Sequence, residues 1–383
     1  MDFEFTEEQR ILRESVDRLL NDQYSFEARR AYAKEPQGFS RELWRHYAEM
    51  GLLGLRIAHH HGGSATSPVE VMITAEAFGR ALVLEPFVAT AVLGGGLLRY
   101  AGNPQQCDHW LPKIADGTQI LAFAHAERQS RYVLADVAAT ARLDGSSWII
   151  DGAKTLVLHG DSADAVITSA RISGAPRDRD GIGLFLVDAK SPGISRRGYP
   201  TIDGQRAADI VFSAVKVAPE AVLGEPGKAL PIIERVVDEA IAALAAEAVG
   251  AMAAMHQLTV DYLKMRRQFG VPIGQFQSLQ HKVVDMLIAL EQARSMAMLA
   301  TMMVDEQDAD ERHRVMAAAK VQIGRSGRLI GQQAVQLHGG IGMTMEYKVG
   351  HYFKRVTAID TLFGDADHHL TALARGGGLI PAV

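Results

Sequence analysis

Residues 266–277 read RRQFGVPIGQFQ, and this short stretch, with two glycines and a proline, separates two long helical patterns. Glycine and proline interrupt helices, so the chain is expected to turn here. Four long stretches have helical character, over 229–267, 277–305, 309–337 and 346–375. Their number and length predict a C-terminal four-helix bundle over residues 227–383.

The residues before this bundle have a different pattern. From about 120 to 223 the apolar runs are short and β-rich, and turn signals such as Asp144-Gly145, Asp151-Gly152 and Ser191-Pro192-Gly193 separate them. Several short strands at this spacing predict a small antiparallel barrel or sandwich over residues 119–226. The polar tract 174–181 is interpreted as the tip of a surface hairpin.

The N-terminal part, residues 1–118, is predicted to be helical. Thr6 and Gln9 form a capping-box pattern before a run of apolar residues at helical spacing. Further helical segments are expected over 40–50, 69–83, 86–100 and 104–116. The fold class is therefore α+β, mostly helical: an N-terminal helical domain, a central β-domain and a C-terminal bundle.

Composition narrows the possible classes of protein. The chain has 383 residues, 48% of them hydrophobic, and a net charge of −5, so no nucleic-acid partner is expected. A single cysteine, Cys107, excludes an internal disulfide. The acidic N-terminus does not resemble a signal peptide, and the longest apolar run, 240–255, is too short to span a bilayer. We expect a cytoplasmic protein without an integral membrane segment. The adjacent histidines 59–61 are not expected to bind a metal.

Four motifs, in order along the chain, resemble those of the acyl-CoA dehydrogenase family. The bundle contains RRQFGVPI followed by Phe276-Gln277 and Gln280, and then QLHGGIG at 336–342. The approach to the β-domain contains GNPQQ at 102–106, LPKI at 111–114 and Ala126-Glu127, and the β-domain contains DGAK at 151–154. Each motif is weak alone, but their order and spacing cover the chain almost end to end.

The resemblance implies an FAD-dependent oxidoreductase that removes hydrogen from the α and β carbons of an acyl-CoA thioester. Electrons would pass to an electron-transfer flavoprotein, and the chain would work in a homo- or hetero-oligomer with a large subunit. The cofactor-binding residues carried over from the family are Phe123, His125, Ala126, Leu156, Leu158, Arg266, Gln268, Phe269, Gln277, Gln336, His338, Gly339, Gly340 and His368.

The chemistry of the bundle motifs fits such a cofactor, and the β-domain motifs depart from the family. Arg266 can pair with a pyrophosphate through a planar fork, and Gly339 and Gly340 allow backbone N–H groups to approach an anion. In the β-domain, 131–133 replace the family's Gly-Ser-Asp turn. Leu156 and Leu158 stand where many members carry an aromatic residue and a hydroxyl.

The reaction needs a base, and both customary positions lack one. The family's glutamate aligns with Gly364, and the alternative position on the first bundle helix aligns with Ala240. Three readings stay open: Asp365 acts as the base, Glu239 or Asp238 acts from the first bundle helix, or a partner subunit supplies it. Asp365 is also a good helix N-cap residue.

The resemblance also implies a dicarboxylic acyl group such as pimeloyl, through residues 126–137 and 362–369. A terminal carboxylate would require an arginine, for which Arg99 and Arg131 are candidates. The alternative function is a non-catalytic structural subunit that completes the flavin site of an active large subunit. A weaker third hypothesis is a flavin oxidase on the same fold.

Overall fold

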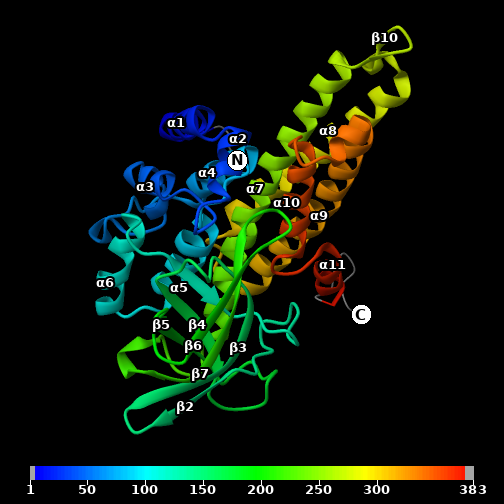
Figure 1. Ribbon diagram of the computed structural model, residues 1–383. Coiled ribbons are helices and arrows are strands. Elements are labelled where there is room, and N and C mark those ends of the chain that lie inside the picture. The colour runs from blue at the N-terminus through cyan, green and yellow to red at the C-terminus, as the bar shows by residue number, and fades with distance from the viewer. Residues whose placement is uncertain (1–4, 376–383) are drawn as a thin grey trace. The chain divides into compact units, whose positions relative to one another are not determined.

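The computed structural model describes residues 5–375, and its contacts divide the chain into two compact units (Figure 1). The first unit contains the residues up to 30, 68–83 and those from 241 onward. The second contains 31–67 and 84–240. Helix α7, Leu230–Met265, belongs to both units because the division falls after residue 240. No helix in the described range is long and apolar enough to cross a membrane.

The second unit combines short helices with a β-sheet. Its helices are α3 (Arg41–Glu49), η1 (Leu52–Gly54), η2 (His59–His61), η3 (Phe87–Gly94), α5 (Gly95–Ala101), α6 (Pro104–Ala115) and η4 (Pro219–Ala221). Its strands are β1 (Leu121–Ala124), β2 (Thr140–Asp144), β3 (Ser147–Leu158), β4 (Ala165–Arg171), β5 (Ile182–Asp188), β6 (Ile194–Pro200), β7 (Arg206–Val217) and β8 (Val222–Leu223). The predicted β-domain is therefore present, and the tract 174–181 is a loop as expected.

The eight strands form one sheet in the order β6-β7-β3-β2-β4-β5-β8, with β1 paired to β4. The pairing is mostly antiparallel, as predicted, but β1 lies parallel to β4, with Leu121 opposite Ala165. The sequence did not predict this parallel pairing, because it joins residues 121–124 to residues 165–168, far away along the chain. Strand β3 carries a register shift between Lys154 and Val157, where Leu156 takes a φ of +51°.

The first unit is helical. It contains α1 (Glu7–Gln23), α2 (Phe26–Tyr32), α4 (Pro68–Ala81), the second part of α7, α8 (Gln277–Met303), α9 (Ala309–His338), η6 (Gly339–Met343), α10 (Val349–Thr361) and α11 (Ala366–Arg375). Thr6 and Gln9 cap α1 reciprocally, as the sequence predicts. A short hairpin, β9 (Arg267–Gln268) with β10 (Val271–Pro272), then η5 (Ile273–Gln275), joins α7 to α8 at one end of the bundle (Figure 1).

The prediction of one long helix over 346–375 is wrong, because the chain breaks between α10 and α11. Phe363 and Gly364 have φ values of +58° and +108°, which no helix accommodates. The buried ammonium of Lys320 donates to the carbonyls of Ile359, Asp360 and Leu362 at 2.6, 3.0 and 2.9 Å. Lys320 therefore satisfies the last carbonyls of α10, where the helix would otherwise leave them unpaired.

Close helix contacts hold the core of the first unit together. A Cβ added at Gly79 on α4 would lie 1.9 Å from the carbonyl oxygen of Glu247 on α7, so the two backbones touch only because residue 79 is glycine. The same residue, Glu247, also pairs through its buried carboxylate with Arg355 on α10, at 2.6 and 2.8 Å. Breaking such a pair from one side leaves an uncompensated buried charge.

We predict that Gly79→Ala destabilises the protein by about 1–3 kcal/mol or more, because the added methyl group overpacks the α4–α7 contact. Thermal unfolding measures the effect. Gly95→Ala is the matched control, since its Cβ would meet only Thr90 O at an ordinary 3.7 Å. Equal melting temperatures for both variants would contradict the packing described here.

Candidate functional site

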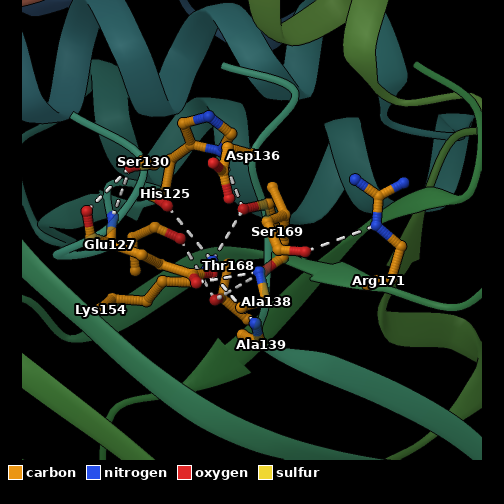
Figure 2. Close-up of polar contacts among 12 residues, drawn as sticks. His125, Glu127, Ser130, Asp136, Ala138, Ala139, Lys154, Thr168, Ser169 and Arg171 are labelled. Atoms are coloured by element: carbon orange, nitrogen blue, oxygen red, sulfur yellow. Dashed lines mark hydrogen bonds and ion pairs between the residues drawn. The ribbon is translucent and has the colours of Figure 1, made fainter. Parts of the chain in front are cut away.

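A buried carboxylate organises the segment that follows β1 (Figure 2). Glu127 Oε1 accepts hydrogen bonds from Lys154 Nζ at 2.6 Å and from Ala139 N at 3.1 Å. Its Oε2 accepts from Ala138 N at 2.9 Å and Gln129 Nε2 at 2.7 Å. Four donors saturate the carboxylate, so it binds the chain on both sides of residues 128–137 to strand β3.

All the hydrogen-bond donors of the Lys154 ammonium group are used. Besides Glu127, Lys154 Nζ donates to His125 O at 3.2 Å and to Ser169 Oγ at 3.1 Å, and its side chain is fully buried. Burial lowers the pKa of Lys154 to about 8, and Glu127 opposes this change. Burial alone would raise the pKa of Glu127, but Lys154 outweighs it, and the net pKa is lowered. The pair is therefore ionised at neutral pH.

His125 joins the same network. Its Nδ1 lies 2.8 Å from Ser169 Oγ, and its ring stacks on Phe123 at 5.3 Å. Burial, and then the positive charge of Lys154, lowers the pKa of His125 to about 3. The imidazole is neutral at physiological pH. His125 and Phe123 thus support the sheet from one side, while Ala126 contributes a backbone carbonyl that accepts Thr155 N at 2.8 Å.

Two polar side chains near Glu127, those of Ser130 and Arg171, make hydrogen bonds to nearby backbone groups. Ser130 Oγ accepts from Glu127 N and donates to Glu127 O at 3.1 and 2.8 Å. Arg171 donates to five backbone carbonyls, of Val137, Asp178, Asp180, Ala135 and Pro176, and so fixes two loops with one side chain. Arg131 takes a φ of +47° and is exposed. The family-like turn at 131–133 is replaced by a self-bonded loop.

Strand β3 presents Leu156, 41% exposed, and the half-buried Leu158 to its surroundings. On the neighbouring strand β7, Asp209 accepts hydrogen bonds from Thr155 Oγ1 at 2.8 Å, Arg197 Nη2 at 2.7 Å and Tyr199 OH at 3.1 Å. A cavity of about 490 Å³ is lined by these polar residues together with Arg128, Ala153, Lys154 and Val211. The charged side chains of Arg128, Arg197 and Asp209 are part of its lining.

In the first unit, two of the sequence motifs meet at one end of the bundle. The ring of Tyr262 on α7 stacks on His338 at the end of α9, with centroids 4.5 Å apart, and Tyr347 lies 5.1 Å from the same histidine. Arg266 follows Tyr262 by one turn, since its N–H donates to Tyr262 O at 2.8 Å. Gly339 directly follows His338. The stack therefore places the RRQFG and HGG motifs side by side.

The surface at this end is open. A Cβ added at Gly339 or Gly340 would meet no described atom within 4 Å, and the φ of +65° at Gly339 favours glycine. The Arg266 side chain is exposed and makes no ion pair or hydrogen bond with another described residue. The remaining predicted residues of this end, Gln268, Phe269, Gln277 and Gln336, are also exposed, and Phe269 is 90% exposed. This end can bind an anionic group from outside the unit.

Of the candidate bases, Glu239 already accepts hydrogen bonds from two side chains of this chain. Its buried carboxylate accepts Arg99 Nη2 at 2.5 Å and Tyr100 OH at 2.6 Å. The guanidinium groups of Arg99 and Arg235 each lie 5.0 Å from the Tyr100 ring centre. Both oxygens of the Glu239 carboxylate are therefore engaged within the chain. Arg99 is equally committed to this ion pair.

Asp365 and His368 lie at the start of α11. Asp365 Oδ1 accepts His368 N at 2.8 Å, which is the bond of a helix N-cap. A Cβ added at Gly364 would lie 2.6 Å from His369 Nε2 and 2.7 Å from His368 Cδ2. Burial lowers the pKa of both histidines, to about 4 for His369. Two neutral imidazoles thus fill the space next to residue 364.

Sequence reasoning missed two organising side chains. Lys154 was part of a quoted motif, yet its partner Glu127 lies 27 residues earlier and only the fold brings them together. Lys320 carries no local signal except a lysine on the apolar side of a helix, flanked by Ala319 and Val321. An isolated charge at an apolar helical position is the pattern that could have revealed it.

The low pKa of His125 predicts a pH dependence of stability. Below its unfolded pKa of 6.5 the unfolded chain binds a proton that the folded chain takes up only near pH 3, so this contribution to stability is lost as the pH falls through that window. His125→Phe should make the slope of unfolding free energy against pH, between roughly pH 4 and 6, shallower by about one proton. Chemical denaturation at several pH values measures it, and parallel slopes would refute the assignment.

Gly364→Glu should lower the melting temperature without creating a catalytic base. The left-handed backbone and the two histidines oppose any side chain, at a cost of about 1–3 kcal/mol for the backbone alone. Gly340→Ala, which adds a methyl group in open space, is the control and should be neutral. A stable Gly364→Glu protein that oxidises acyl-CoA would show that the turn is not closed.

Comparison with known proteins gives a consistent result. Models of the N-terminal, middle and C-terminal domains of acyl-CoA dehydrogenases match residues 6–118, 122–215 and 230–378. Acyl-CoA dehydrogenase FadE12 of Mycobacterium tuberculosis is 30% identical over 313 residues, covering 80% of both chains.

Two solved structures are also similar over nearly their whole length. A variant of the Tcur3481-Tcur3483 steroid ACAD has a TM-score of 0.87 at 29% identity and covers 97% of both chains. PigA with FAD and proline has a TM-score of 0.89 at 26% identity and covers 98% of both chains. The motifs, the three matched domains and these relatives agree: the chain belongs to the acyl-CoA dehydrogenase family of FAD-dependent oxidoreductases.

Proposed function

We propose that this chain is one subunit of a hetero-oligomeric acyl-CoA dehydrogenase, in which a related partner chain supplies the catalytic base. The observation that carries the proposal is the turn at Gly364, together with the exposed groups of the bundle end that contains Arg266 and Gly339. A glutamate there would be strained at a φ of +108° and would require the imidazoles of His368 and His369 to move. The bundle end keeps Arg266, Gly339 and Gly340 exposed for a cofactor.

The bundle end fits the pyrophosphate of FAD. Arg266 would hold it through charge-assisted hydrogen bonds, Gly339 and Gly340 would let backbone N–H groups approach it, and Gln268 and Gln336 would add neutral hydrogen bonds. When bound, FAD accepts the β-hydride of the acyl group, and an electron-transfer flavoprotein would reoxidise it. The Tyr262–His338 stack keeps Arg266 and Gly339 at a fixed separation.

The α-proton would be taken by a carboxylate of the partner chain. Here, Glu239 is bound by Arg99 and Tyr100, and Asp365 caps α11. Each carboxylate thus already accepts hydrogen bonds within this chain. The similar steroid ACAD is named as a pair, Tcur3481-Tcur3483, which supports a two-chain assembly. We place this assembly in the cytoplasm, since the only cysteine is Cys107.

For the substrate we propose a dicarboxylic acyl-CoA such as pimeloyl-CoA. The stretches 126–137 and 362–369 resemble the small subunit of pimeloyl-CoA dehydrogenase, which is the basis for this choice. Arg99 is held by Glu239, so the exposed Arg131 is the better candidate for the terminal carboxylate. A guanidinium discriminates a carboxylate from a methyl end strongly, because only the carboxylate can accept its hydrogen bonds.

The same closed turn favours a second candidate, a subunit that takes no part in the chemistry and only completes and stabilises the partner. The two functions differ in whether this chain contacts the acyl group. Replacement of Arg131 separates them, since only a chain that contributes to the acyl pocket can alter substrate preference.

To test the proposal, the tagged chain would be purified from its own host with its associated chain and mixed anaerobically with pimeloyl-CoA. We predict that the complex bleaches its flavin band and that the tagged chain alone does not. Arg131→Gln should lower kcat/KM for pimeloyl-CoA at least about 10-fold relative to heptanoyl-CoA. An unchanged ratio would favour the structural subunit, and bleaching by the chain alone would contradict the proposal.

A further inference from the structure

We infer that the bundle end of this chain contributes to a flavin that is seated on the β-domain of a partner chain. The β-domain of this chain holds no flavin of its own. This inference rests on the proposed function, because it requires a partner chain of the same family. It deepens that proposal by assigning a stoichiometry, one FAD for two chains.

The first argument is the set of hydrogen-bonding groups available on the β-domain. Ala126, Leu156 and Leu158 offer no polar side chain to a flavin ring. The hydroxyls nearest to them are spent, since Ser130 Oγ bonds the backbone of Glu127 and Thr155 Oγ1 bonds Asp209. A flavin ring has several carbonyl and ring-nitrogen acceptors, which would lose their hydrogen bonds to water without replacement.

The second argument is the backbone of the loop that follows β1. Its N–H groups at Ser130, Val133 and Asp136 donate to carbonyls of the same loop, at 3.0 to 3.1 Å for the outer two and 2.9 Å for Val133. Those at Ala138 and Ala139 donate to the carboxylate of Glu127. Cofactor pyrophosphates are commonly bound by such backbone N–H groups. In this loop an internal carboxylate already takes the place of an external anion.

The bundle end has the opposite character. Arg266 is exposed without a partner among the described residues, and Gly339 and Gly340 have open space in front of them. The Tyr262–His338 stack joins the ends of α7 and α9 from which Arg266 and Gly339 follow. A rigid anion site that nothing in its own unit occupies is suited to a cofactor carried by another chain.

Two measurements test the inference. FAD fluorescence is first titrated with the purified single chain at micromolar concentration, and no saturable quenching is expected. The flavin released from the purified complex is then counted against protein, with about one FAD expected per two chains. Stoichiometric binding to the single chain, or one FAD per chain in the complex, would overturn the inference while leaving the hetero-oligomeric dehydrogenase intact.

A pair of variants tests whether the bundle end of this chain holds the flavin. Arg266→Ala should weaken retention of flavin by the complex at least about 10-fold during gel filtration, as expected for loss of a charge-assisted pair with pyrophosphate. Lys264→Ala removes an exposed cation from the same end of α7 and should leave flavin retention unchanged. Equal retention by both variants would show that the bundle end does not hold the cofactor. Failure of the complex to form at all would instead count against the proposed function.

Discussion

The ion pair between Glu127 and Lys154 is the constraint on which the β-domain depends. It joins the segment after β1 to the middle of β3, and its carboxylate also accepts the N–H groups of Ala138 and Ala139 (Figure 2). An ionised pair without solvent access is stable only when every donor and acceptor is satisfied, and here all are. The backbone between 128 and 137 is therefore held by internal bonds, while the side chains of Arg128 and Arg131 stay exposed.

The turn before α11 follows the same principle in the other unit. Lys320 binds three carbonyls at the end of α10, and Asp360 Oδ1 accepts Ala366 N at 3.2 Å. Together with the N-cap of Asp365 these bonds hold Phe363 and Gly364 in left-handed conformations. Residue 364 is thus held in a backbone conformation that strains any side chain other than that of glycine. At this turn, internal bonds surround the position where the family carries its glutamate.

The sequence was sufficient to predict the order of helices, strands and helices, because periodicity and turn residues are local. It also singled out Arg266, Gly339 and Gly340, whose spacing is a motif, and their role in binding the cofactor stays a prediction. It could not predict the break after Thr361 or the parallel pairing of β1 with β4, since both depend on side chains and strands far away along the chain. The partners of Glu239 were hidden for the same reason: Arg99 lies 140 residues earlier. The three-domain division at 118 and 226 stays a prediction.

The central claim is that this chain lacks the base that removes the α-proton of the acyl group, and that its partner provides this base. The most direct measurement follows the α-protons of pimeloyl-CoA in heavy water by NMR, with the chain alone and with the purified complex. The account predicts that only the complex exchanges them for deuterium. Exchange by the single chain at the rate of the complex would contradict it, since a base would then act within this chain.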